Sequence, residues 1–441
     1  MEKSFSFEDA LSLVLGNMVG TGIFAASPLL LQYAPSTGDT LLLWLLAGFI
    51  AYSGSMCFAE LALLVPESGS EGTYIKNGFG IINLKLGYYL GYLFSWTAIS
   101  LMKTASLAVM CDIFSSYFLN IFSAESTVFK IKFTSLLLIS CLSLIANYST
   151  SASKSVNNAM FLTKTSLVAW IIIAGLLANV FNRELCDGDI NFNRKNSNYL
   201  ESLTIGLFDA GFAFDGWSNL NYIASELNHV GDLVKALQVG VPVVSLSYFL
   251  LNMSYFIVLD ENDILASQTV AVDFGHQILG NYGIIIPFLI SLSALGAING
   301  TIISNSRLMY SSAIQGDIPA VLTYLSVYKT PSFCILLNWI LTCIYIILGD
   351  ISSLINLISP FYYGFLFLST ISLVLIRLRK PRTQFRVHPF LLTFFLCMSF
   401  FLWLVPLFTN PLRWLLGLCI ISIGLIVKWY VPDHYYETED P

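Results

Sequence analysis

Glycine is concentrated in one stretch of an otherwise apolar segment near the start of the chain. Gly16, Gly20 and Gly22 fall within seven positions, and Pro28 follows them. Each glycine inside a helix costs about 1 kcal/mol relative to alanine, so this composition is unfavourable for an uninterrupted helix. At membrane depth such a break is stable only where its free backbone groups face protein or a cavity. The stretch therefore indicates either a close-packing helix face or a ligand site made of exposed amides and carbonyls.

The backbone on the two sides of this break would attract opposite charges. The amides of Thr21 and Gly22 begin the second half-helix, where the helix dipole favours an anion. The carbonyl of Met18 ends the first half-helix and favours a cation. A free α-amino acid carries a carboxylate and an ammonium group close together, and it would match both ends.

A second break lies farther along the chain. The apolar segment 202–227 is interrupted at Gly211–Trp217, where Asp215 precedes Gly216. Asp215 either caps the following half-helix or lies beside the substrate, where its carboxylate would favour a cationic side chain. Phe212, next to the break, is a candidate aromatic gate. Gly20, Gly216 and Ser218 complete the candidate substrate-binding positions.

Four further ionisable residues interrupt the apolar segments. A charge at the bilayer centre costs roughly 2.5–3.5 kcal/mol, so each calls for a partner or a role. Lys164 either reaches the cytoplasmic interface or stands as a fixed cation where a transporter would otherwise bind Na⁺. Asp209, near the outer end of 202–227, is expected to be solvated. Lys103 and Asp112 are nine residues apart, too far for a helical pair, and are expected to face aqueous vestibules.

The composition places these residues in a membrane protein. The chain has 441 residues, of which 56% are hydrophobic and only 11% charged, with a net charge of −6. A soluble protein has about one quarter charged residues. Nothing suggests nucleic acid as a partner, and the lipid bilayer is the expected surroundings. No enzyme signature, metal-ligand cluster or paired-cysteine motif occurs, so we expect no enzyme, no cofactor, no metal and no disulfide framework.

The apolar runs predict an all-α membrane protein with twelve transmembrane helices and no visible cleavable signal peptide. The expected spans are 9–34, 40–65, 84–119, 133–150, 158–181, 202–227, 236–259, 282–313, 331–349, 353–377, 389–408 and 412–430. The two breaks lie five helices apart, which predicts an inverted 5+5 repeat with discontinuous first and sixth helices. Within one transporter domain, the repeats would cover 9–181 and 202–377. Two extra helices at 389–430 and a short cytoplasmic tail at 431–441 would follow.

The distribution of Lys and Arg predicts the orientation in the membrane. With the N-terminus inside, thirteen of these residues fall in cytoplasmic loops and six in outer loops. Cytoplasmic loops carry the excess of Lys and Arg in membrane proteins. Both termini are therefore expected to be cytoplasmic, and the plasma membrane is the expected location.

These motifs together resemble a known family. The glycine pattern of Gly16–Phe24 is similar to that of the amino acid–polyamine–organocation transporters, which have the inverted 5+5 repeat. Four further motifs resemble the light subunits of heteromeric amino acid transporters, the L-type family: Cys57–Leu61, Val270–Gly275, Asn299–Thr301 followed by Ser306-Arg307, and Arg377–Pro381. The resemblance covers about residues 8–385.

The resemblance implies roles for individual residues. The Thr21 and Gly22 amides would hold the substrate carboxylate, and the carbonyls of Met18, Phe212 and Asp215 would hold its ammonium group. Phe212 would be the gate, and Lys164 would match the lysine that occupies a sodium site in sodium-independent members. The implied activity is one-for-one exchange of L-amino acids without sodium. Asp215 resembles the branch that exchanges dibasic amino acids and cystine for neutral ones.

Two departures from the family pattern affect the expected partner and gating. The loop 120–130 lacks the cysteine that bonds the light subunit to a single-span heavy-chain glycoprotein, so only a non-covalent heavy chain is expected. The loop 228–232 lacks the usual proline, and Lys103 replaces a typical arginine. A proton-coupled or uniport permease, with Asp215 or Lys164 titrating, and a non-transporting amino acid sensor stay open as alternatives.

Overall fold

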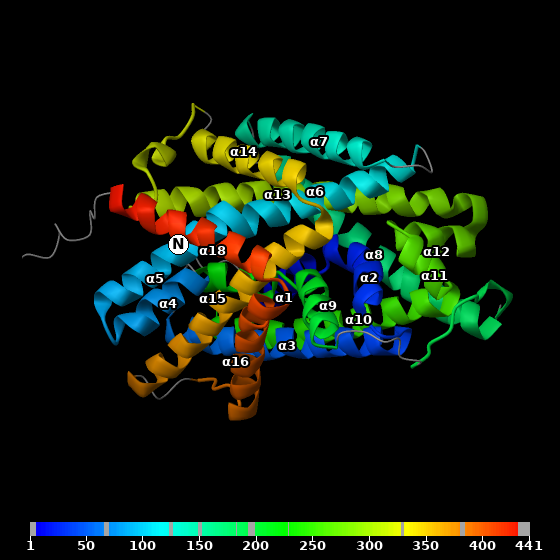
Figure 1. Cartoon of the computed structure of the whole chain (residues 1–441), viewed down its shortest axis with the longest axis horizontal. Helices are drawn as coiled ribbons and strands as arrows, with labels where there is room; N and C mark the ends of the chain where they lie inside the picture. The colour runs from blue at the N-terminus through cyan, green and yellow to red at the C-terminus, as the bar shows by residue number, and fades with distance from the viewer. Residues whose placement is uncertain are drawn as a thin grey trace, which may run out of the picture.

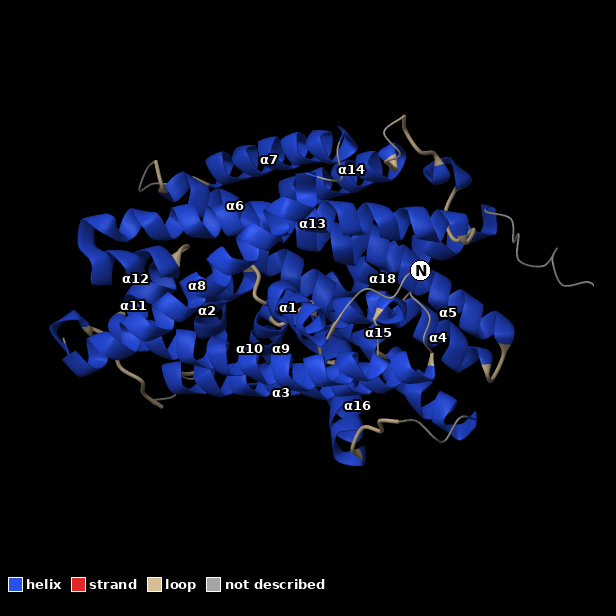
Figure 2. Ribbon diagram, turned by 180° about the vertical axis from the view of Figure 1, so that it is seen from behind, coloured by secondary structure: helices blue, strands red, loops and turns tan. Residues whose placement is uncertain are grey.

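The computed structural model describes residues 6–65, 70–122, 127–148, 152–181, 183–192, 199–227, 229–327, 330–379 and 384–430. Within these ranges the chain forms helices joined by short loops, without a β-strand (Figure 2). This agrees with the all-α prediction. The tail expected at 431–441 and part of the loop 120–130 lie outside the described residues.

Membrane-length helices account for most of the predicted spans. Nine described helices are long and apolar enough to cross a membrane, or ten if one bent pair counts as a single span. The two remaining predicted spans coincide with shorter apolar helices, at 202–213 and 332–348. The nine to ten membrane-length helices among the described residues give the protein its multi-pass membrane character, while the twelve spans and the internal repeat stay predictions.

The first half of the chain contains the bent pair and the long third span. Its helices are α1 (Phe7–Met18), α2 (Gly22–Tyr33), α3 (Thr37–Leu64), α4 (Ser70–Gly80), α5 (Leu84–Thr97), α6 (Lys103–Asn120), α7 (Val128–Tyr148) and α8 (Ala152–Phe181). A π-helical turn, η1 (Ala98–Met102), joins α5 to α6. This continuous rod explains why the apolar run at 84–119 is longer than one span needs.

The second half begins with the interrupted segment. Its α-helices are α9 (Tyr199–Ala213), α10 (Val230–Val258), α11 (Glu261–Ala266), α12 (Val270–Leu279), α13 (Ile285–Ile314), α14 (Ser332–Leu348), α15 (Ile351–Arg379), α16 (Pro389–Leu404), α17 (Pro406–Thr409) and α18 (Pro411–Tyr430). Short 3₁₀ helices lie between them, including η3 (Trp217–Glu226) directly after the second break.

The interrupted helices lie in the centre of the bundle. Figure 1 shows α1, α2 and α9 between a layer of α6 and α13 on one side and α3 on the other. Within its 18-residue apolar stretch, α3 has 72% of its residues buried, whereas the matching stretch has 22% buried in α7 and 17% in α18. Because lipid is as apolar as a protein core, α7, α16 and α18 can present exposed apolar side chains to the bilayer. Residues that need protein on every side lie at the centre of the bundle.

Local sequence sets where the first helices begin and end. Ser6 and Asp9 form a reciprocal capping box at the start of α1, and the Ser36 side chain accepts from the Asp39 amide at the start of α3. α1 ends just before Val19, and the chain bends by 45° before α2 begins. The glycine-rich sequence thus produces a bend at the predicted position.

Candidate functional site

The first break leaves polar groups at the centre of the bundle. The carbonyl of Met18, at the end of α1, accepts from the Gly20 amide at 2.8 Å. Thr21 begins α2 without a side-chain cap, and its buried hydroxyl has no hydrogen-bond partner among the described residues. The first amides of a helix have no partner within it, so the start of α2 keeps donors available.

The second break packs directly against the first. α9 ends at Ala213, and Gly216 follows with φ +109°, a conformation that glycine adopts readily. A Cβ atom added to Gly216 would lie 2.7 Å from the carbonyl oxygen of Asn17, in the last turn of α1. A Cβ added to Gly22 would lie 3.0 Å from the Cα of Ala213. Two segments nearly two hundred residues apart in sequence therefore meet backbone to backbone.

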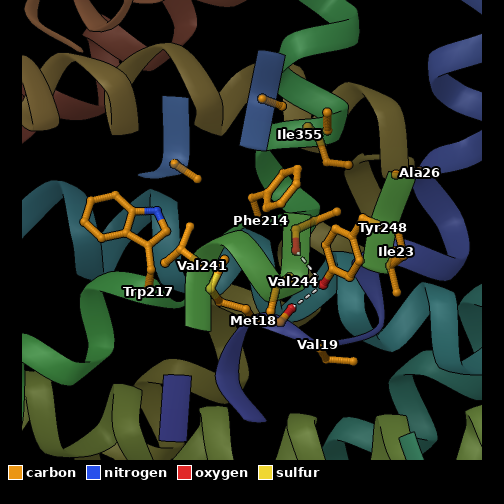
Figure 3. Close-up of a cluster of buried hydrophobic side chains, with 14 of the residues drawn as sticks. Met18, Val19, Ile23, Ala26, Phe214, Trp217, Val241, Val244, Tyr248 and Ile355 are labelled. Carbon is orange, nitrogen blue, oxygen red and sulfur yellow. Dashed lines mark hydrogen bonds between the residues drawn. The ribbon is translucent and has the colours of Figure 1, made fainter. Parts of the chain in front are cut away.

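Tyr248 of α10 links the two breaks. Its hydroxyl lies 2.6 Å from the carbonyl oxygen of Met18 and 3.2 Å from that of Ala213. Figure 3 shows the ring packed beside Phe214, with the hydroxyl directed at Met18. The Tyr248 side chain is fully buried. The carbonyl expected to hold an ammonium group thus already accepts a hydrogen bond in this conformation.

Lys164 extends into the bundle interior rather than to the interface. Its side chain is 8% exposed, and the ammonium group donates to the carbonyl of Gly16 in the last turn of α1. Of the two sequence interpretations, this geometry matches the fixed cation. The charge lies within one helical turn of the first break and occupies the carbonyl there.

A cavity lies beside the second break. It has a volume of about 50 Å³ and is lined by Glu71, Phe94, Met102, Lys103, Ser106, Gly211, Phe212, Asp215, Ile358, Ser359, Tyr362 and Tyr363. The Asp215 carboxylate accepts from the Gly216 amide at 2.8 Å and from the Tyr362 hydroxyl at 3.1 Å. The Asp215 carboxylate thus bonds the backbone of the break and also lines the cavity, whereas the following helix η3 begins after Gly216 without a side-chain cap.

Phe212 stands between the cavity and the first break. It lines the cavity, and its ring carbon Cδ1 would lie 3.3 Å from a Cβ added to Gly22. Met18, Gly20, Thr21 and Gly22 do not line the cavity. The aromatic ring thus separates the backbone groups of the first break from the space beside Asp215.

The structure does not bring every candidate residue to the cavity. Ser218 is buried in η3 and is not part of the lining; its carbonyl accepts from the Asn221 side chain at 3.3 Å. Gly20 has room for a side chain, because an added Cβ would approach nothing closer than 3.9 Å. Close packing therefore does not require glycine at this position.

Two expectations about charged residues were wrong. Asp209 was expected to be solvated, but it is fully buried, because its position in α9 faces the interior. Asp112 was expected to face a vestibule, but it is 2% exposed and forms an ion pair with Lys132 of α7 at 2.5 Å. Lys132 comes from a neighbouring helix, so spacing within one segment could not reveal it. Lys103, in contrast, does line the cavity.

Three residues of this region were missed from the sequence. Tyr248 and Tyr362 lie inside long apolar segments, where one tyrosine among many gives no signal. Glu71 follows a polar loop, a position typical of a solvated side chain, yet it is 3% exposed and lines the cavity. Within the described residues no group of three or more His, Cys, Asp or Glu side chains could hold a metal ion.

Comparisons with known proteins agree on the kind of molecule. The family model described as amino acid permease matches residues 5–425. The b(0,+)-type amino acid transporter 1 of Mus musculus is 32% identical over 448 residues, covering 99% of this chain and 89% of the relative. Large neutral amino acids transporter small subunit 2 of Homo sapiens is 28% identical, covering 97% and 80%. Asc-type amino acid transporter 1 of Homo sapiens is also 28% identical, covering 96% and 81%.

These matches extend over nearly the whole chain, so they include both breaks, the cavity and the peripheral helices. The related proteins are named as transporters and not as enzymes. The chain therefore belongs to the amino acid permease family, a family of multi-pass membrane transporters, and within it to the L-type amino acid transporters.

Proposed function

We propose that this chain is a sodium-independent exchanger of cationic and neutral L-amino acids that works by alternating access. The observation that carries the proposal is the contact between the two helix breaks beside a cavity that contains the Asp215 carboxylate. Helix ends at a midplane break provide amides for a carboxylate and carbonyls for an ammonium group. Both groups belong to the backbone shared by all amino acids.

In the proposed site the Thr21 and Gly22 amides bind the carboxylate, and the carbonyls of Met18, Phe212 and Asp215 bind the ammonium group. The Phe212 ring lies against Gly22, so it must swing away before a substrate reaches these amides. The unpartnered hydroxyl of Thr21 then gains an acceptor. Tyr248 must share or release the Met18 carbonyl as the ammonium group arrives.

The substrate side chain would extend into the cavity. Asp215 and Glu71 are acidic and Lys103 is basic, so the lining carries two potential negative charges and one positive charge. This excess favours a Lys-, Arg- or ornithine-like side chain. A relative named for large neutral amino acids is similar over 97% of this chain, which supports neutral substrates as the second class.

Independence from sodium is proposed from Lys164. Its ammonium group already donates to the Gly16 carbonyl, so it supplies the positive charge that a bound sodium ion would supply at this carbonyl. A covalently attached cation cannot leave with the substrate. Substrate gradients alone would then drive transport.

Counterflow in liposomes tests the proposal. Purified protein is reconstituted, vesicles are loaded with unlabelled arginine or leucine, and uptake of labelled amino acid is followed with and without sodium. Uptake should require internal substrate and should be equal in sodium and choline media. Uptake that needs a sodium gradient and ignores internal substrate contradicts the exchanger. Uptake that needs only a pH gradient selects the proton-coupled permease, and binding without flux selects the sensor.

The setting in the cell is part of the same proposal. We place the chain in the plasma membrane with both termini cytoplasmic, following the distribution of Lys and Arg. A heavy-chain glycoprotein would associate without a disulfide, because the sequence of loop 120–130 has no cysteine. Such a complex would separate in denaturing gels without any reducing agent.

A further inference from the structure

Asp209 is an acidic residue that the proposed substrate site does not use. It lies in α9, four residues before Ala213, where the helix breaks. Its side chain is fully buried, and neither carboxyl oxygen has a hydrogen-bond partner among the described residues. An ionised carboxylate without a partner in such surroundings costs many kcal/mol, whereas a neutral acid costs far less.

The direction of Asp209 follows from its neighbours on α9. Gly206, one turn earlier, faces Leu43 of α3, since an added Cβ would lie 2.9 Å from Leu43 Cδ1. Ala213, one turn later, packs on Gly22 of α2. Residues three or four apart share a helix face. Asp209 therefore belongs to the face that α9 packs against α2 and α3.

None of the helices packed against α9 offers Asp209 a charge or a hydrogen bond within the described residues. On α2, Ser27 donates to Asn252 of α10. On α3, Asp39 accepts from Ser36, and Glu60 is bound to Arg377 of α15. The other titratable or charged residues of these helices are Tyr33, Tyr52, Cys57, Tyr362, Tyr363 and Arg379, and none of them bonds Asp209.

Trp44 of α3 has an unused hydrogen-bond donor, which complements the unused acceptors of Asp209. Its indole N–H is buried and also lacks a partner, while its ring packs on Phe214 at the second break. An unused donor on α3 and an unused acceptor on α9 therefore lie on two helices that pack together. A rotation or shift of α9 relative to α3 would change the surroundings of both groups. The packed arrangement favours the neutral acid, and an opened interface favours the carboxylate.

From this geometry we infer that Asp209 is a proton-binding site that controls the movement of α9. The acid holds its proton while α9 is packed on α2 and α3, and it releases the proton to water when this interface opens. Return to the packed state requires that the proton binds again. Because each exchange cycle passes through the packed state, exchange slows as the pH rises. This inference rests on the proposed exchange function and adds a ligand, the proton, to it.

The test is leucine–leucine counterflow in liposomes with the same pH inside and outside. Leucine does not change its charge between mildly acidic and mildly alkaline pH, so any pH effect belongs to the protein. The wild-type rate should fall by up to about tenfold per pH unit once Asp209 titrates. In D209N the amide imitates the neutral acid. At every pH its rate should therefore stay near the value that the wild type has at low pH. The matched control is D112N, a buried acid paired with Lys132, which should keep the wild-type pH profile.

Each outcome bears on one hypothesis. Absence of counterflow in the wild type overturns the proposed function. Counterflow that is independent of pH, or that has the same pH profile in D209N, overturns the proton site alone. If D209N does not transport, thermal unfolding of the purified proteins decides. A group that is protonated in the folded state and ionised in the unfolded state makes the fold less stable as the pH rises. Unfolding temperatures that fall equally in wild type and D209N therefore also overturn the inference.

Discussion

The hydroxyl of Tyr248 lies 2.6 Å from the carbonyl oxygen of Met18, so a fully buried side chain of α10 holds the end of α1. The same hydroxyl lies 3.2 Å from the carbonyl of Ala213, the last residue of α9. One tyrosine thus connects both discontinuous helices. Any conformational change that separates the two breaks must first release at least one of these contacts.

Replacing Tyr248 by phenylalanine should destabilise the protein by about 1 kcal/mol, because the buried Met18 carbonyl loses one of its two donors and the contact with the Ala213 carbonyl is removed. The matched control is Tyr255→Phe, also on α10, whose buried hydroxyl has no partner among the described residues. Its removal should be neutral or slightly stabilising. Thermal unfolding of both variants measures the difference. Equal shifts would show that the Tyr248 hydroxyl contributes no more than the Tyr255 hydroxyl.

Gly216→Ala should disrupt the contact between the breaks. Residue 216 has φ +109°, which costs a residue with a side chain about 1–3 kcal/mol, and its Cβ would lie 2.7 Å from the Asn17 oxygen. We expect a lower unfolding temperature and a loss of counterflow. Gly231→Ala, at the start of α10, has free space around it and should behave like the wild type. A G216A protein that transports normally would refute a tight contact here.

Asp215→Asn should reduce the preference for arginine over leucine by on the order of tenfold, equivalent to about 1.4 kcal/mol. Tyr362→Phe keeps the carboxylate and removes only the 3.1 Å hydrogen bond, so its effect should be smaller. Competition of both amino acids for uptake of labelled arginine measures the preference. Unchanged preference in D215N would mean that another residue of the cavity sets selectivity.

Lys164→Gln should lower the exchange rate on the order of tenfold, because the first break loses its fixed charge. Lys164→Arg keeps the charge and should recover part of the rate. Lys235→Gln removes an exposed lysine whose ammonium lies 3.9 Å from Asp232, and it should have no effect. Initial rates of counterflow give the comparison. If the Gln and Arg variants are equally slow, side-chain length and not charge is what the site requires.

Glu60→Gln should destabilise the protein by about 3–5 kcal/mol, since it leaves Arg377 without its buried partner. The guanidinium donates to both Glu60 oxygens, at 2.7 and 2.5 Å, and the Val387 amide donates to the same carboxylate at 2.7 Å. This pair ties α3 to α15 and to the segment before α16. Asp232→Asn, which removes a long ion pair with the exposed Lys235, should cost about 1 kcal/mol or less in the same unfolding assay.

Both helix breaks could be located from the sequence because glycine acts locally. Gly16, Gly20 and Gly22 weaken the helix wherever the segment is placed, and the structure bends there by 45°. Gly216 adopts positive φ, which a sequence rich in glycine permits. The membrane class also follows from the sequence alone, since the length and apolarity of a run are properties of that run.

The surroundings of individual charges could not be read in the same way. Asp209 and Asp112 interrupt apolar segments in the same manner, yet one has no partner among the described residues and the other meets Lys132 of α7. Which face of a helix points inward depends on the helices beside it. Hydropathy sums over all faces and therefore cannot distinguish these positions.

The sequence by itself determined that this chain is an α-helical membrane protein with two interrupted helices, because hydrophobic length and glycine content are local properties. Only the tertiary structure decided that the breaks touch, that Tyr248 links them, that Phe212 separates the first break from the cavity, and that Asp209 is buried without a partner. These relationships join residues that are distant in sequence, and packing between helices alone brings them together.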